Sequence, residues 1–116
     1  MTKTATTDSI VVKNLQAELP ITGEATTSRT VVSNDAARVV SFAMDAGQEL
    51  TDHSAPRPAV IQVVEGNLTL TVAAQRHELV AGDAVYLAPN ERHAVVAMTP
   101  CRFVLVLVTA AKAAAD

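Results

Sequence analysis

The chain has 116 residues, enough for one domain with a single hydrophobic core and too few for two. Hydrophobic residues make up 49 % and charged residues 18 %, a globular rather than a disordered composition. The 9 basic and 12 acidic residues give a net charge of −3, and the basic residues are spread along the chain. This argues against a nucleic-acid partner, because phosphate binding needs a concentrated basic face.

The two ends of the chain differ from its middle. The opening MTKTATTDSI lacks the apolar core of a signal peptide, and the longest apolar run, residues 103–108, is too short to span a bilayer. We therefore expect a cytoplasmic protein with no membrane partner. IVVKNLQAEL predicts a short helix or an added strand, so residues 1–24 are expected to form an N-terminal segment at a dimer interface. Residues 25–109 are expected to form the single domain, and residues 110–116 a frayed tail.

From residue 25 onward, short β-branched runs alternate with turn residues, without a helical period. The runs are ATTSRTVVS, RVVSFAM, VIQVV, LTLTV, RHELV, AVYL, HAVVAM and RFVLVLV. About eight strands at this spacing predict an all-β, antiparallel sandwich or barrel. In LTLTV, Leu68 and Leu70 share one face and Thr69 lies on the other, so this strand is expected to have one face in water.

Other runs are apolar on both faces. In RFVLVLVT, Phe103 and Leu105 face one way while Val104 and Val106 face the other. Outward apolar residues need a cover, and the alternatives are the N-terminal segment or a second subunit. We expect a homodimer, because symmetric pairing lets one patch bury itself.

Two segments of this region carry regular spacings of glycine and histidine. In the first, Gly47 precedes His53 by six positions, and Ala55, Ala59 and Gly66 follow.

In the second, Gly82 is followed by Pro89, Asn90, His93 and Ala97.

These spacings resemble the two motifs of the cupin superfamily, over residues 37–108. The resemblance implies a double-stranded β-helix, the RmlC-like jelly-roll barrel, with the motifs on facing strands. Asn90 stands where the second motif has a turn glycine, and asparagine tolerates the left-handed backbone conformation that favours glycine there.

In a metal-binding cupin, the resemblance implies that three histidines and one glutamate hold iron, manganese, zinc, copper or nickel. This chain keeps His53 and His93 and has Ala55 and Ala59 at the other two positions. A stable site normally takes three or four protein ligands, so we expect any divalent transition metal here to be weakly held, at low occupancy.

We interpret the chain as a small-molecule-binding cupin of unassigned role, with a cavity beside the two alanines. The expected pocket residues are His53, His93, Ala55, Ala59, Phe42 and Met44. The alternatives are a metal-dependent enzyme of the oxygenase or isomerase type, a metal-free enzyme with a histidine general base, and an interaction module that uses its outer sheet.

Four further side chains lie near the motifs. We expect His77 to have a structural role, because it shares a face with an apolar wall position. Cys101, the single cysteine, excludes an internal disulfide and is expected to be an inert buried thiol. Arg57 and Arg92 are expected at the barrel rim, either in solvent or paired with a carboxylate ligand.

Overall fold

The computed structural model describes residues 4–109, which form nine strands and one short helix. The elements are α1 (Leu15–Glu18), β1 (Thr26–Ser33), β2 (Ala37–Met44), β3 (Glu49–His53), β4 (Ala59–Glu65), β5 (Asn67–Val72), β6 (Gln75–Val80), β7 (Ala84–Leu87), β8 (His93–Ala97) and β9 (Cys101–Val108). The frayed tail expected at residues 110–116 lies outside the described residues.

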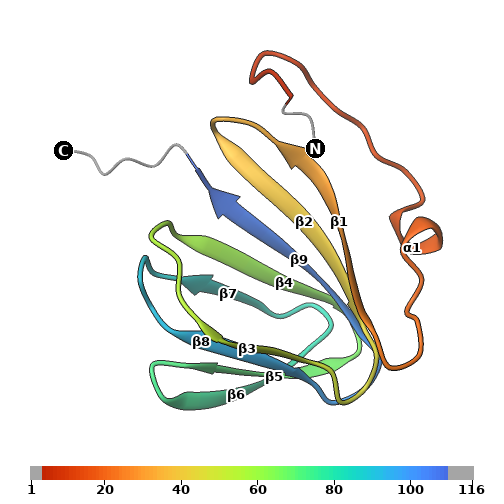
Figure 1. The fold of residues 1–116 in the computed structure, drawn as a ribbon, viewed down its shortest axis with the longest axis vertical. Helices are drawn as coiled ribbons and strands as arrows, with labels where there is room; N and C mark the ends of the chain where they lie inside the picture. The colour runs from red at the N-terminus through yellow and green to blue at the C-terminus, as the bar shows by residue number, and fades with distance from the viewer. Residues whose placement is uncertain (1–3, 110–116) are drawn as a thin grey trace.

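The strands form two antiparallel sheets that face each other (Figure 1). One sheet has the order β1-β2-β9-β4-β7 and the other the order β3-β8-β5-β6, so strands distant in the sequence are neighbours in space. This topology confirms the predicted all-β jelly-roll barrel.

The core lies between the two sheets and is built mainly from aliphatic side chains. Met44, Leu68 and Leu70 have no exposed surface, and Phe103 is 1 % exposed. The ring of Phe103 stacks on that of Phe42 with centroids 4.8 Å apart. Alternation along each strand therefore places one apolar set in the core, as it does for Leu68 and Leu70 of β5.

The opposite face of β5 differs from its prediction. Thr69 is only 5 % exposed, and its hydroxyl has no hydrogen-bond partner within the described part of the chain. A threonine on the outer face can be buried because its cross-strand neighbours, Val96 and Glu78, flank it on both sides. The predicted wet face is therefore wrong at this position.

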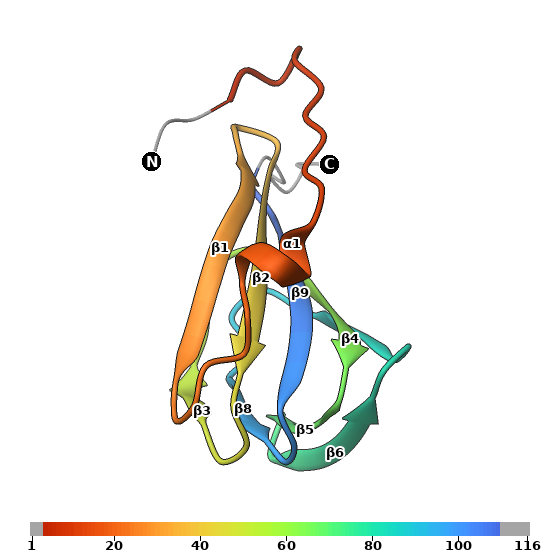
Figure 2. The ribbon, with the colours of Figure 1, turned by 90° about the vertical axis from the view of Figure 1, so that its right-hand side faces the viewer.

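The N-terminal segment crosses the outer face of the five-stranded sheet, with α1 lying over it (Figure 2). Leu19, just after α1, is 7 % exposed, and its carbonyl oxygen accepts a hydrogen bond of 2.6 Å from Arg102. Glu18 forms an ion pair with Arg29 of β1. Part of the outward face is thus covered by the chain itself.

An apolar row remains on that outer face. The strand register joins one residue from each of the five strands, and these residues are Val32, Val39, Val106, Val60 and Tyr86. The valines are partly buried, while Tyr86 is 65 % exposed. This row is the surface on which a second copy would pack, and the homodimer stays a prediction.

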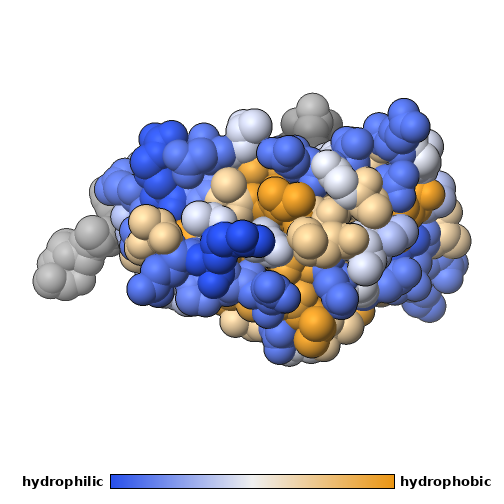
Figure 3. Space-filling model, turned by 90° about the horizontal axis from the view of Figure 1, so that it is seen from below, coloured by the Kyte–Doolittle hydropathy of each residue, from blue (hydrophilic) through white to orange (hydrophobic). Residues whose placement is uncertain are grey.

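Hydrophobic surface is also visible from below, between hydrophilic patches (Figure 3). The exposed large hydrophobic residues of the barrel strands and turns include Val64, Val80 and Met98.

No helix within residues 4–109 is long and apolar enough to cross a membrane.

Candidate functional site

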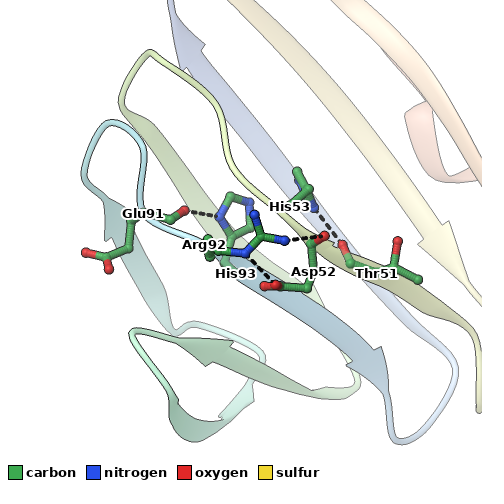
Figure 4. A network of polar contacts seen from close by, with 6 residues as sticks. All are labelled: Thr51, Asp52, His53, Glu91, Arg92 and His93. Carbon is green, nitrogen blue, oxygen red and sulfur yellow. Dashed lines mark hydrogen bonds and ion pairs between the residues drawn. The ribbon is translucent and has the colours of Figure 1, made fainter.

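The barrel brings His53 and His93 together. His53 ends β3, His93 begins β8, and the two residues are register partners in this antiparallel pair. Their ring centroids are 4.2 Å apart at an interplanar angle of 62°. His93 is 8 % exposed and His53 is exposed, so the pair lies at the edge of the interior (Figure 4).

Each imidazole is held by a backbone carbonyl close to it in the sequence. Nδ1 of His53 lies 2.8 Å from the carbonyl oxygen of Thr51, and Nδ1 of His93 lies 3.0 Å from that of Glu91 (Figure 4). Because a carbonyl oxygen only accepts, Nδ1 must donate, and Nε2 of each neutral ring then carries the lone pair. The two Nε2 atoms have no hydrogen-bond partner among residues 4–109 and are available to a ligand.

A cavity of about 190 Å³ lies beside the histidines, and we call it the outer cavity. Its lining residues are His53, Ala55, Arg57, Ala59, Leu87, Ala88, His93, Leu105 and Leu107. Both alanines that stand at the motif positions thus border open space. Tyr86 does not fill that space: it is absent from this lining, is 65 % exposed and is the register partner of Val60 in the outer row.

A second cavity of about 160 Å³, the inner cavity, shares His53, His93 and Leu105 with the outer one. Its other lining residues are Phe42, Leu50, Ile61, Val95 and Phe103. Five of the six predicted pocket residues therefore border one of the two cavities. Met44 borders neither and is fully buried in the core.

The two arginines near the motifs have different surroundings. Nε of Arg92 donates a 2.6 Å hydrogen bond to the carboxylate of Asp52, which ties the strand ends that carry the two histidines (Figure 4). Both partners are more than half exposed, so this ion pair adds little stability. Arg57 instead borders the outer cavity and has no ion-pair partner within residues 4–109.

His77 and Cys101 lie away from the histidine pair. His77 is exposed on β6, opposite Leu70 of β5, and borders neither cavity. Cys101 is fully buried at the start of β9. Burial raises the pKa of its thiol to about 11, and the charge of Glu65 acts in the same direction.

We expect Cys101 to react slowly in the folded protein. At pH 8, a pKa of about 11 leaves roughly a thousandth of the thiol as thiolate, whereas an unfolded cysteine titrates near 8.5. The reaction with a disulfide reagent should therefore be at least about a hundredfold slower in native buffer than in denaturant, and faster as the pH rises toward 11. Stopped-flow absorbance measures both rates, and equal rates would contradict the burial of this thiol.

The residues at this site do not fit a stable transition-metal centre. Within residues 4–109, no group of three or more histidine, cysteine, aspartate or glutamate side chains is placed to hold a metal ion. The imidazoles of His53 and His93 offer two nitrogen donors, whereas stable protein sites use three or four ligands.

Comparisons with known proteins agree with this architecture. A family model described as a cupin domain matches residues 40–108. No curated protein sequence matches the chain.

Several solved structures are similar. A conserved protein of unknown function from Streptococcus pyogenes is 25 % identical over 93 % of this chain and 95 % of its own, with a TM-score of 0.79. A cupin superfamily protein from Desulfitobacterium hafniense is 14 % identical over 81 % of this chain and 86 % of its own, with a TM-score of 0.77. A mutant of salicylate 1,2-dioxygenase from Pseudoaminobacter salicylatoxidans is 16 % identical over 76 % of this chain and 27 % of its own, with a TM-score of 0.70. The last two similarities show a shared fold.

Proposed function

The chain belongs to the cupin domain family, and from that premise we propose that it binds a small molecule in the two cavities beside His53 and His93. The family supplies the barrel, but unrelated activities use the same barrel, so the proposal depends on the site itself. The observation that carries it is the open space bordered by Ala55 and Ala59 next to two imidazoles with free Nε2 atoms.

The lining of the cavities supports this proposal. Small-molecule sites are mostly apolar, with a few polar groups that fix the orientation of the ligand. Here leucine, alanine and phenylalanine side chains form the walls, and the imidazoles are the polar groups that both cavities share. Each cavity has about the volume of the engineered apolar cavity of roughly 150 Å³ that accepts benzene. The ligand is therefore about the size of one ring, or of two if it enters both cavities.

Benzyl alcohol is a suitable neutral probe, because its ring matches the apolar walls and its hydroxyl can donate to a histidine Nε2. We expect saturable shifts of the methyl resonances of Leu50, Leu105 and Leu107 in nuclear magnetic resonance spectra. The dissociation constant should be in the millimolar range, on the order of 1 mM, as is typical of ligands with so few atoms. Methyl groups on the outer face, such as those of Val64, should not shift.

A cavity-filling variant provides the control. Ala55→Phe places a ring in the outer cavity and should weaken benzyl alcohol binding at least about tenfold. Ala84→Phe adds the same ring at an exposed position of β7 that borders neither cavity and should leave binding unchanged. Absence of saturable shifts in the wild-type protein, or equal binding by the two variants, would contradict the proposed function.

A further inference from the structure

We propose that the ligand is a small apolar carboxylate whose negative charge is bound by Arg57 at the outer cavity. This inference rests on the proposed function and names the chemical class of its ligand. It comes from the charges around the two cavities rather than from their shape.

Arg57 combines a guanidinium that forms no ion pair within residues 4–109 with a place at a cavity, whereas the other two arginines without an ion pair, Arg38 and Arg76, border neither cavity. Arg29, Arg92 and Arg102 each form an ion pair with a glutamate or an aspartate. Within residues 4–109, no carboxylate occupies the corresponding position at Arg57. A guanidinium offers paired N–H donors whose geometry matches a carboxylate, so Arg57 can receive one from a ligand.

The lining of the outer cavity favours a negative charge over a positive one. Neither cavity has an aspartate or glutamate among its described lining residues, and Arg57 is the permanent charge of the outer cavity. A cationic ligand would meet Arg57 without any compensating carboxylate. An anionic ligand would have its partner at the cavity border and apolar walls beside it.

The walls determine the rest of the ligand. Beyond the histidine pair, the inner cavity is lined by hydrocarbon, including the stacked rings of Phe42 and Phe103. A molecule with a carboxylate at one end and a ring or branched alkyl group at the other would place its charge beside Arg57 and its apolar body against Leu105 and Leu107. Such a ligand buries apolar surface while its charge stays paired and near solvent.

The test compares three probes of nearly equal shape: phenylacetate, phenylacetamide and 2-phenylethylamine. Calorimetric or methyl-resonance titration of the full chain should give tighter binding of phenylacetate than of phenylacetamide by about tenfold, with the amine weakest. Higher salt should weaken phenylacetate binding more than phenylacetamide binding, because Arg57 is exposed enough for ions to screen it.

Arginine variants identify the residue responsible. Arg57→Leu should lower phenylacetate affinity about tenfold and leave phenylacetamide affinity unchanged, whereas Arg57→Lys should retain part of the preference. Arg76→Leu is the matched control, because Arg76 is an exposed arginine of β6 that borders neither cavity. It should leave all three affinities unchanged.

The outcomes separate this inference from the proposed function. If benzyl alcohol binds but phenylacetate and phenylacetamide bind equally well, or if Arg57→Leu leaves their ratio unchanged, the carboxylate inference is overturned and the binding function stands. If neither benzyl alcohol nor phenylacetate gives saturable shifts, both are overturned.

Discussion

Replacing Gly66 with alanine is expected to destabilise the barrel by about 3 to 5 kcal/mol. Gly66 joins β4 to β5 with a φ of +78°, and a Cβ atom there would lie 2.2 Å from the carbonyl oxygen of Pro100 and 2.9 Å from Cα of Cys101. The first atom belongs to the backbone of the turn before β9 and the second to the backbone of the first residue of β9, so no side-chain rotation can relieve the overlap. A loss of that size is a large part of the 5 to 15 kcal/mol by which domains are typically stable.

The variant Gly47→Ala separates the cost of a positive φ from the cost of steric overlap with the backbone. Gly47 also has a positive φ, +87°, but a Cβ atom there would meet nothing within 4 Å. This variant should lose only the conformational part, about 1 kcal/mol. Thermal and denaturant unfolding should then show a melting temperature for Gly66→Ala that is roughly 10 °C or more below that of Gly47→Ala. Melting temperatures within about 2 °C of each other would contradict the close approach of the Gly66 turn to Pro100.

The fold was predictable because its determinants are local and repeated. Each strand is a short β-branched run ended by turn residues. The spacing of the motif residues resembles that of the cupins, and this resemblance predicted the arrangement of the strands in the barrel. Asn90 confirms one such local inference, since it adopts a φ of +66° where the motif has a glycine. Pairing of His53 with His93 follows from the same spacings and is seen in the register of β3 with β8.

The residues that line the cavities were harder to predict. They depend on how far along its strand each residue lies and on which face of the strand points inward. Met44 shares a face with Phe42 but lies two residues further along β2, about 7 Å deeper, where the core is closed. Leu105 and Leu107 belong to a strand that is apolar on both faces, so alternation could not show which set points inward. Pairing of β9 with β2 and β4 determines that parity, and it is visible only in three dimensions.

The surroundings of the charged residue Arg57 could not be predicted from the sequence either. The sequence places it near the first motif, with solvent and a ligand carboxylate as alternatives. Its place at the outer cavity depends on the path of the SAPRP segment between β3 and β4. A proline-rich loop has no regular period, so its path could not be predicted from the sequence. Arg92 is instead paired with Asp52 of the neighbouring strand β3, and this pairing is likewise visible only in the structure.

Restoring the missing motif side chains should convert the histidine pair into a metal site. Ala55 and Ala59 border the same cavity as His53 and His93, so Ala55→His with Ala59→Glu would provide four ligands instead of two. We expect the affinity for Ni²⁺ or Zn²⁺ to increase at least about a hundredfold over the wild type. The wild-type protein, purified without an affinity tag from metal-replete medium, is expected to contain less than about a tenth of an equivalent of any transition metal.

Stability gives a second readout of the same double variant. Ala59 is 5 % exposed, so a glutamate at this position buries a carboxylate, and the metal-free variant should melt below the wild type. Added Zn²⁺ should raise its melting temperature, because a ligand that binds the folded state stabilises it.

Two controls show whether the new ligands converge with the old ones. Ala55→His alone should give an intermediate affinity, since three donors form a weaker site than four. Adding His93→Ala to the double variant removes the donor carried by β8, the strand paired with β3, and should cost most of the gained affinity. If the double variant binds Zn²⁺ within about threefold of the wild type, or if loss of His93 has no effect, positions 55 and 59 do not face the histidine pair closely enough to share one ion. A gain that depends on His93 would instead show that the two alanines keep this barrel from holding a metal and leave the space in which we place its ligand.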